Sequence, residues 1–326
     1  MKEIYLAGGC FWGAEHYFRN IEGVVDTEVG FANGDTPSPT YEQVYTDTTG
    51  YAETVRVIYN PDALPLDELL RDFFCAIDPL SVNKQGEDEG TRYRTGVYYS
   101  DPEDLAVARM VFDEVRESFG EPLAVELEPL RNFYQADGRH QDYLVKNPDG
   151  YCHLPLKIFR YPRLVSDLKH LLGDEPDFVA RLSNAAALLK ERMGFFWTGF
   201  YLVGEADQSG TSGGHGHGGA SADGKELILG PFQGSVACMR IGYGRGVCGT
   251  AWKEARTVVV PDVEEFPGHI ACSSLSKSEI VVPVFRGGEV IGVLDIDSDE
   301  VSTFDRVDAF WLERVVNVVR FPGDTM

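Results

Sequence analysis

The chain has 326 residues, of which 43% are hydrophobic and 12% aromatic. A single hydrophobic core rarely serves more than about 250 residues, so this length predicts two packed domains. Acidic residues outnumber basic residues by 52 to 29, and the resulting net charge of −23 repels phosphate backbones and anionic lipid headgroups. The composition therefore excludes disorder throughout the chain and predicts neither a nucleic-acid partner nor a membrane partner.

Short strand and helix patterns alternate in the first half of the chain. Strands are predicted at 4–7, 53–59, 95–99 and 123–127, and helices at 9–20, 66–76 and 102–119. The alternation breaks near 159–163, where we place a domain boundary. This half therefore predicts a mixed α/β domain over residues 1–162.

The second half, 163–326, has a different pattern. A helical stretch at 164–192, interrupted at 173–176, precedes strand-like runs at 197–203, 226–229, 257–260, 280–284 and 290–296 and a last helix at 304–319. We expect a mainly antiparallel sheet flanked by helices. Seven of the sixteen residues from 209 to 224 are glycine, which predicts a flexible loop over about 205–225 and not a preformed metal site at His215 and His217.

The six cysteines, at positions 10, 75, 152, 238, 248 and 272, carry much of the remaining information. No apolar stretch approaches the ~20 residues of a membrane span and no signal-peptide core follows Met1, so a cytoplasmic location is expected. Structural disulfides are rare in that reducing compartment, and the sequence has no CxxC pair of the kind that most structural zinc sites use. Redox or nucleophilic chemistry remains, with no metal expected.

Cys10 and Glu53 are the first candidates for such chemistry. Cys10 follows Gly8-Gly9 where a strand passes into a helix, and the first turn of a helix favours a thiolate; the alternative is a buried structural cysteine. Strand alternation places Glu53 on one face with Tyr51 and Val55. A carboxyl on an apolar face has a raised pKa and can act as a general acid, unless Glu53 lies at a sheet edge and meets water.

Five segments in the same order resemble the peptide methionine sulfoxide reductase A family over residues 1 to about 160. They are GGCFWGAEHYF at 8–18, PTY at 39–41, TGYAE at 49–53, NKQGEDEGTRYR at 83–94 and NPDGYC at 147–152. The resemblance implies an α/β sandwich with a mixed sheet and reduction of methionine-(S)-sulfoxide in proteins and in the free amino acid. It also implies no bound cofactor and recycling by thioredoxin or a similar dithiol.

The same resemblance implies a role for each matching residue. Cys10 would attack the sulfoxide sulfur and become a sulfenic acid, while Glu53, Tyr41 and Tyr93 would serve the departing oxygen. Phe11 and Trp12 would form the pocket for the methyl group, and Asp88 would belong to the polar network. Cys152 would then form a disulfide with Cys10.

Three positions depart from the family pattern or stand outside it. Ile77 stands where many members have a histidine, and Gly138-Arg139 precedes His140 where an aromatic residue is common, so the pocket rim is expected to differ. Cys75 lies in an apolar helical segment and is interpreted as a core residue.

Three acidic residues mark a second candidate site. Asp295 and Asp297 are two residues apart and project from one face of a strand, and Glu279 is a third candidate. Two acids on one face repel each other unless a cation or protons lie between them, although a solvated strand end is an equal alternative. The GRGVCG segment at 244–249 matches the GxGxxG pattern, but the surrounding strands predict antiparallel pairing, so we interpret it as a turn-forming loop.

A second resemblance, to the free methionine-(R)-sulfoxide reductase family, covers about 163 to 320. It rests on WTGFY at 197–201, LGPFQG at 229–234, GRGVCGTA at 244–251, GHIAC at 268–272, SEIV at 278–281 and GVLDIDS at 292–298. It implies a GAF domain in which Cys272 is the nucleophile, Cys238 the resolving partner and Cys248 an auxiliary redox cysteine. Glu279, Asp295 and Asp297 would bind the ammonium group, and Trp197 and Tyr201 would enclose the thioether end.

Taken together, the two resemblances imply a bifunctional methionine sulfoxide reductase. The alternative is a single-site methionine-(S)-sulfoxide reductase whose GAF domain binds a ligand and regulates its neighbour. Three cysteines beside three acids favour catalysis over sensing.

Overall fold

The structure is a computed structural model that describes residues 1–206, 221–270 and 274–320. The chain forms two compact units, Met1–Arg163 and Leu164–Met326. The domain boundary predicted after residue 162 lies within one residue of this division. The helix expected to begin at residue 164 starts earlier, because helix α6 (Lys157–Leu172) runs through 159–163 with Pro162 inside. Ile158, Tyr161 and Leu168 are buried at helical spacing on either side of this proline, and their burial outweighs the one helical hydrogen bond that a proline removes.

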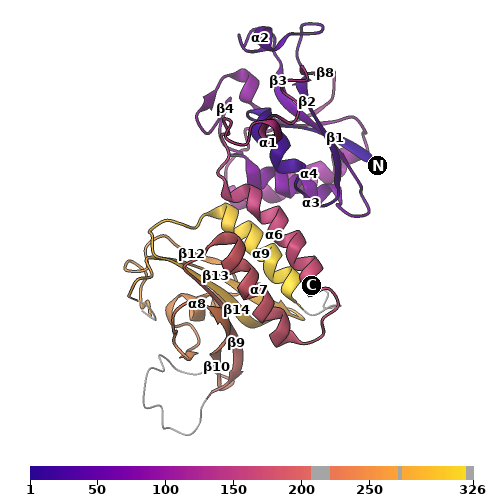
Figure 1. The fold of residues 1–326 in the computed structure, drawn as a ribbon. Coiled ribbons are helices and arrows are strands. Elements are labelled where there is room, and N and C mark those ends of the chain that lie inside the picture. The colour runs from indigo at the N-terminus through magenta and orange to yellow at the C-terminus, as the bar shows by residue number, and fades with distance from the viewer. Residues whose placement is uncertain (207–220, 271–273, 321–326) are drawn as a thin grey trace. The chain divides into compact units, whose positions relative to one another are not determined.

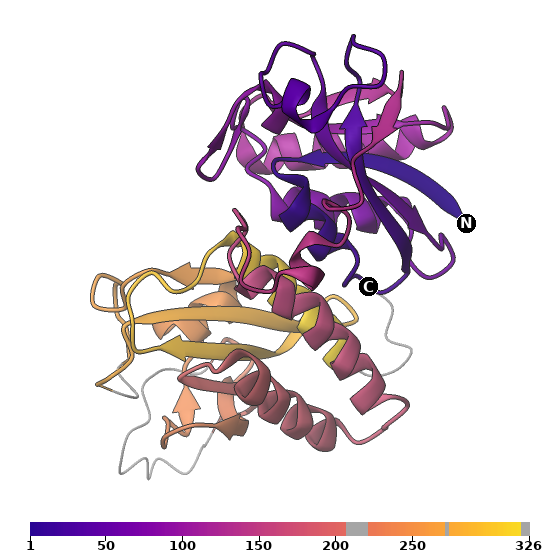
Figure 2. The same cartoon turned by 45° about the horizontal axis from the view of Figure 1, so that its top comes forward.

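The first unit is built around a six-stranded twisted sheet with strand order β7-β6-β1-β3-β2-β8 (Figures 1 and 2). Only β6 and β7 pair in parallel; the other pairs are antiparallel, so the expected mixed α/β architecture is confirmed. The strands are β1 (Lys2–Gly8), β2 (Val24–Ala32), β3 (Ala52–Tyr59), β6 (Thr95–Tyr99), β7 (Glu126–Pro129) and β8 (Phe133–Gln135). The helices are α1 (Phe11–Phe18), α2 (Tyr41–Val44), η1 (Thr91–Tyr93), α3 (Leu66–Ala76), α4 (Asp104–Phe119) and α5 (Tyr143–Lys146), and a small ribbon pairs β4 (Lys84–Gln85) with β5 (Asp88–Glu89).

Helix α1 packs on one face of this sheet, against β1, β2 and β3. Leu6, Val29 and Val97 project from that face together with Val55, because their backbone partners lie opposite each other in register. All four side chains are fully buried. The strand that carries Glu53 is therefore central in the sheet and covered by a helix, which places the start of α1 over the middle of the core.

The second unit holds a six-stranded sheet with strand order β11-β10-β9-β14-β13-β12, and every pair is antiparallel. The antiparallel prediction is confirmed. The strands are β9 (Trp197–Glu205), β10 (Lys225–Gln233), β11 (Arg240–Ile241), β12 (Val258–Val260), β13 (Ser278–Arg286) and β14 (Glu289–Ser298), and the helices besides α6 are α7 (Phe178–Met193), α8 (Gly246–Glu254) and α9 (Arg306–Val319). Of the loop predicted at about 205–225, residues 207–220, with His215 and His217, lie outside the described residues.

The two faces of this sheet are covered differently (Figure 1). Helices α7 and α9 lie against it on one side, whereas α8 contacts β13 and β14 from the side that carries Tyr201, Val281 and Val293. These three side chains cluster with Cys238 and Cys248. The site predicted from the acidic residues therefore lies under α8.

The GxGxxG segment is not a loop throughout, and the prediction needs correction. Gly244 and Gly246 adopt positive φ angles of 71° and 59° and make the expected turn, but α8 begins at Gly246 and includes Cys248. A Cβ atom at Gly249 would lie 2.3 Å from the carbonyl oxygen of Gly242, so glycine at this position lets α8 approach the backbone of Gly242 closely. No helix within the described ranges is long and apolar enough to cross a membrane.

Candidate active sites

Cys10 lies at the junction that the sequence predicted, as the N-cap of α1 directly after β1, and its side chain is buried. Gly9 makes the turn with φ of 82°, and a Cβ atom there would lie 2.7 Å from Gln85 Cβ. The expectation of a thiolate requires correction. Burial, and next the charge of Glu53, raise the pKa of Cys10 well above its usual range, and the Trp12 backbone at the helix start offsets this only in part.

Glu53 lies on β3 and is 1% exposed, so the alternative of a solvated edge position is wrong. Its Oε2 accepts a hydrogen bond of 3.1 Å from the backbone N–H of Phe11, which ties the carboxyl to the residue after Cys10. Burial raises the pKa of Glu53 to about 8, with the Phe11 hydrogen bond opposing the shift. The carboxyl is therefore mostly protonated at neutral pH, which is the state that a general acid needs.

Two phenol groups accompany Glu53. Tyr41 begins α2 and Tyr93 ends η1, and burial together with the charges of Glu53 and Cys10 raises the pKa of both. The Arg92 guanidinium lies over the Tyr93 ring, 4.4 Å from its centre, and packs against it. At neutral pH both tyrosines keep their protons and can donate hydrogen bonds to an oxygen atom that gains negative charge.

An aromatic pocket of about 450 Å³ opens beside these groups. Its lining residues are Trp12, Tyr41, Glu42, Tyr45, Arg139, His140 and Tyr143. Trp12 stacks on Tyr143 at 3.8 Å between ring centres, and its indole N–H donates to His140 Nδ1 at 3.3 Å. Phe11 is buried behind Tyr41 with ring centres 6.4 Å apart. Sequence reasoning missed Tyr143, although its spacing of three residues from His140 was a signal.

The remaining predicted residues of this unit lie nearby, apart from Cys75, which is buried in α3. A Cβ atom at Gly13 would lie 3.0 Å from Cys152 Sγ, so this sulfur packs on the helix that Cys10 begins. Asp88 accepts a hydrogen bond of 2.9 Å from the Tyr151 hydroxyl. Ile77 is buried against Gly8 and does not line the pocket, whereas Arg139 and His140 do. Of the two departures from the family pattern, the structure places only Gly138-Arg139 at the pocket.

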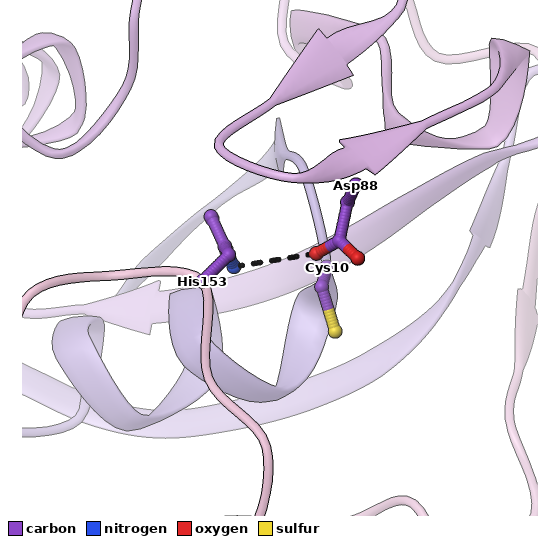
Figure 3. A group of neighbouring side chains, drawn as sticks. All are labelled: Cys10, Asp88 and His153. Carbon is purple, nitrogen blue, oxygen red and sulfur yellow. Dashed lines mark ion pairs between the residues drawn. The ribbon is translucent and has the colours of Figure 1, made fainter.

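Sequence motifs assigned no role to His153, yet the structure brings its ring into this group. Its Nδ1 lies 4.0 Å from Asp88 Oδ2. A ring nitrogen of His153, a carboxylate oxygen of Asp88 and Cys10 Sγ all lie within 4.8 Å of one another. Figure 3 shows the imidazole and the carboxylate facing each other next to the start of the α1 helix.

In the second unit, the three predicted carboxyl groups share one face of the sheet. Glu279 on β13 pairs directly with Asp297 on β14. Asp295 lies two residues before Asp297 on β14 and so projects from the same face. Glu279 and Asp295 are each 6% exposed, so the alternative of a solvated strand end is wrong for them. Cys248 Sγ on α8 lies 3.8 Å from Glu279 Oε1 and closes the site from above.

The three acid groups lie close together in a place that the protein shields from water. Burial, and then mutual repulsion, raise the pKa values of Glu279 and Asp295 well above their usual range, and burial raises the pKa of Asp297 to about 6. The same burial raises the pKa of the Cys248 thiol. A cation placed here would relieve the repulsion, and carboxylates with a thiolate bind either an ammonium group or a metal ion.

A small cavity of about 30 Å³ adjoins the acids. Its described lining residues are Ile241, Arg245, Gly246, Val247, Cys248, His269, Ile270, Glu279, Asp295 and Asp297. His269 Nε2 lies 3.9 Å from Glu279 Oε2. Sequence reasoning missed Ile241, Arg245 and the pair His269 and Ile270. For this pair the signal was their place in the GHIAC segment, which ends at Cys272.

The predicted aromatic residues and Cys238 belong to one buried cluster on this face of the sheet. Trp197 is opposite Asp297 in the β9–β14 register, and Tyr201 donates a hydrogen bond of 3.0 Å to the Cys238 carbonyl. Neither aromatic ring is among the described residues that line the cavity. Cys238 is disulfide-bonded, and Cys272 lies outside the described residues, so its predicted role as nucleophile stays a prediction.

Two family models match this chain and identify the class of protein to which it belongs. The family model for peptide methionine sulfoxide reductase matches residues 2–170, just over half of the chain, and a GAF domain model matches residues 178–321. The chain therefore belongs to the peptide methionine sulfoxide reductase family and carries a GAF domain after the reductase domain. The first resemblance drawn from the sequence motifs is confirmed at the level of the family, and the second at the level of the GAF domain.

Particular relatives cover one half of the chain each. Peptide methionine sulfoxide reductase MsrA of Clostridium acetobutylicum is 51% identical over 160 residues, which are 49% of this chain and 99% of the relative. Free methionine-R-sulfoxide reductase from Neisseria meningitidis, solved with its substrate, is 47% identical with a TM-score of 0.42 and covers 49% of this chain and 85% of its own. The reduced form of Mxr1 from Saccharomyces cerevisiae is 42% identical with a TM-score of 0.45, over 46% of this chain and 88% of its own.

Proposed function

We propose that the first domain reduces methionine-(S)-sulfoxide in proteins and in the free amino acid. The observation that carries this proposal is the buried, protonated Glu53 tied to the residue after Cys10. Cys10 sulfur attacks the sulfoxide sulfur, Glu53 protonates the sulfoxide oxygen, and Tyr41 and Tyr93 stabilise it by hydrogen bonds. The S–O bond of the sulfoxide and the transient bond between the two sulfur atoms then break, the oxygen passes to the Cys10 sulfur, and methionine leaves. One thiol and one sulfoxide thus become one sulfenic acid and one thioether.

The aromatic pocket explains how the substrate would be held. A methyl group on the sulfoxide sulfur is apolar, and Phe11 and Trp12 offer an apolar surface close to Cys10. The pocket is open to solvent on the side of Arg139 and Glu42, so a peptide chain has room to continue beyond the methionine side chain. Substrate selection then rests on the thioether end, and the backbone of the substrate matters less.

Recycling needs a second thiol. We propose that Cys152, which packs on α1 near Cys10, attacks the sulfenic sulfur and releases water, leaving a Cys10–Cys152 disulfide. Asp88 keeps the loop of Tyr151 and Cys152 close through its hydrogen bond. A dithiol such as thioredoxin then reduces the disulfide by exchange, and the cytoplasm, where we place the protein, supplies that reductant.

The GAF domain is proposed to reduce free methionine-(R)-sulfoxide. Glu279 and Asp295 are buried and Asp297 is half-buried beside them, and charge-assisted hydrogen bonds to an ammonium group would compensate the cost of ionising them. A methionine inside a peptide has no ammonium group, so the site discriminates against peptides by leaving its acids unpaired. Cys272 is the proposed nucleophile, Cys238 the resolving cysteine and Cys248 an auxiliary redox cysteine, with Trp197 and Tyr201 around the thioether.

Four substrates and two variants test both assignments. The S and R epimers, each free and in a short peptide, are assayed with Cys10→Ser and with Cys272→Ser. We expect Cys10→Ser to lose both S activities and to keep free R activity, and Cys272→Ser to do the reverse. If the full chain shows no R activity and Cys272→Ser changes only the S rate, the GAF domain is a regulatory module and the second assignment is wrong.

A further inference from the structure

His153 is a buried histidine that the proposed reduction of the sulfoxide does not use. It directly follows Cys152, and its side chain is 2% exposed. Neither ring nitrogen makes a hydrogen bond of normal geometry within the described ranges, and Asp88 Oδ2, which faces the ring, has no such partner either. Buried polar atoms without partners cost free energy, so a native structure keeps them where they serve a function.

The ring lies where both thiols of the proposed disulfide can reach it. A Cβ atom at Gly13 would lie 3.3 Å from His153 Nδ1 and 3.0 Å from Cys152 Sγ, so the ring and the sulfur share one contact surface on α1. Cys10 and Gly13 are three residues apart at the start of that helix and so lie on the same face. A ring nitrogen of His153 lies within 4.8 Å of Cys10 Sγ.

The charged and titratable groups around the ring come from several elements. Asp88 faces it from β5, Cys10 from the start of α1 and Cys152 from its own segment, while Glu53 is bound to the backbone N–H of Phe11, the residue after Cys10. Burial lowers the pKa of His153, with Asp88 and the Gly8 backbone acting in the opposite direction. The imidazole is therefore neutral at pH 7 and able to accept a proton, and the nearby Asp88 carboxylate would stabilise the cation that results.

Disulfide formation needs a proton carrier at this place. The Cys152 thiol must lose its proton to attack, yet burial raises its pKa, and the hydroxyl on the Cys10 sulfenic acid must gain a proton to leave as water. An imidazole that a carboxylate orients performs such a double transfer in cysteine and serine enzymes.

We propose that His153, oriented by Asp88, carries the proton of the Cys152 thiol to the leaving hydroxyl of the Cys10 sulfenic acid. The S–H bond of Cys152 and the S–O bond of Cys10 break, and the S–S bond and one water molecule form. The Cys10 sulfur is reduced and the Cys152 sulfur is oxidised, so no further oxidant or reductant is needed. This inference rests on the proposed role of Cys152 as the resolving cysteine.

Rapid single-turnover measurements on His153→Ala and the milder His153→Gln test it. Reduced enzyme is mixed with one equivalent of free methionine-(S)-sulfoxide in the Cys272→Ser background, and methionine release, sulfenic acid trapped by dimedone and loss of thiols are followed in time. The matched control is His170→Ala, an exposed histidine of α6. In both His153 variants we expect methionine release at the rate of the unaltered chain. Disulfide formation should be about 100-fold slower, because proton transfer by a side chain contributes about 10²–10⁴-fold to a rate. The Cys10 sulfenic acid should therefore accumulate.

The pH profile separates proton transfer from a merely structural role. In the variants, disulfide formation should rise about tenfold per pH unit, because hydroxide must now remove the Cys152 proton, while the unaltered chain shows a flat profile above neutrality. Unchanged disulfide rates, or equal slowing of both steps at every pH, would overturn the proposal. Absence of methionine release in the unaltered chain would instead refute the proposed function, and release without any Cys10–Cys152 disulfide would refute the role of Cys152.

Discussion

The two sites bury carboxyl groups beside cysteines in different ways. The first has one carboxyl, Glu53, held by a backbone N–H at the start of α1, and an aromatic pocket on its open side. The second has three carboxyls in a row across two paired strands, under a helix that carries a thiol. Both sets have raised pKa values because of burial, but the number of acids differs.

The number of carboxyl groups distinguishes a site that donates a proton from a site that binds a cation. A single protonated carboxyl can donate to the sulfoxide oxygen and remain neutral between turnovers. Three adjacent carboxyls cannot all ionise unless a positive charge joins them. Under the proposed function, the first site therefore serves the sulfoxide group wherever it occurs, and the second serves a small molecule with an ammonium group of its own.

The largest effect is expected from the nucleophile of the first site. Cys10→Ser should reduce S-epimer turnover by at least about 10³-fold, because a hydroxyl is a far weaker nucleophile than a thiolate. Free R-epimer turnover should not change. The measurement is steady-state methionine formation from each epimer, with Cys75→Ala as the matched control, since Cys75 is buried in α3 and has no role in the proposed chemistry. Loss of activity in the control instead would show that the wrong cysteine was assigned.

Glu53→Gln should lower the S-epimer rate by about 10²–10⁴-fold, the usual contribution of a general acid. Because the pKa of Glu53 is raised to about 8, it is protonated below that pH, and methionine release should fall as the pH rises through 8. The glutamine variant should lack this inflection. An unaltered inflection in Glu53→Gln, measured by single-turnover release against pH, would assign the proton to another group.

Asp297→Asn should weaken binding of free methionine-(R)-sulfoxide by about 10–100-fold, since a hydrogen bond between charged groups contributes about 1.5–3 kcal/mol. The pKa of Asp297 is raised to about 6, so binding should strengthen as the pH rises through 6 and the carboxylate forms. KM measured against pH checks both points. Asp299→Asn, an exposed acid two residues further on, should leave KM unaltered.

The smallest effect concerns stability. Glu279, Asp295 and Asp297 have pKa values raised by folding, so the folded GAF domain binds more protons than the unfolded chain above about pH 4. The free energy of unfolding of the domain should therefore be largest at low pH and should fall as the pH rises through the raised pKa values. Thermal unfolding of the full chain should show a GAF transition that moves down by several °C between pH 5 and pH 8. Asp297→Asn should reduce that movement.

Sequence reasoning succeeded where the signal was local. Helix α3 was predicted with its observed bounds, because apolar residues recur at helical spacing from Leu66 and proline precedes it. It failed at Pro162, where burial on both sides keeps α6 continuous, and at Gly246–Glu254, where a helix follows a turn-forming glycine pair. In both places packing of distant residues outweighs the local preference.

The first site shows the same division. The motif around Cys10 and the alternation at Glu53 were enough to select both residues, but the thiolate expected from the helix start is opposed by burial that only the sheet creates. His153 has no periodic or motif signal, and it became a candidate only when the fold placed its ring beside Asp88 and Cys10.

The sequence alone determined two domains, the reductase family of the first, the mixed and antiparallel sheets and nearly all candidate residues, because these follow from chain length, periodicity and ordered motifs. The tertiary structure decided which carboxyls are shielded from water, which thiols keep their protons and which histidine lies beside Cys10 and Cys152. Desolvation and proximity depend on residues far apart in the chain, such as Glu53 and Phe11 or Asp88 and His153, and no local pattern encodes them.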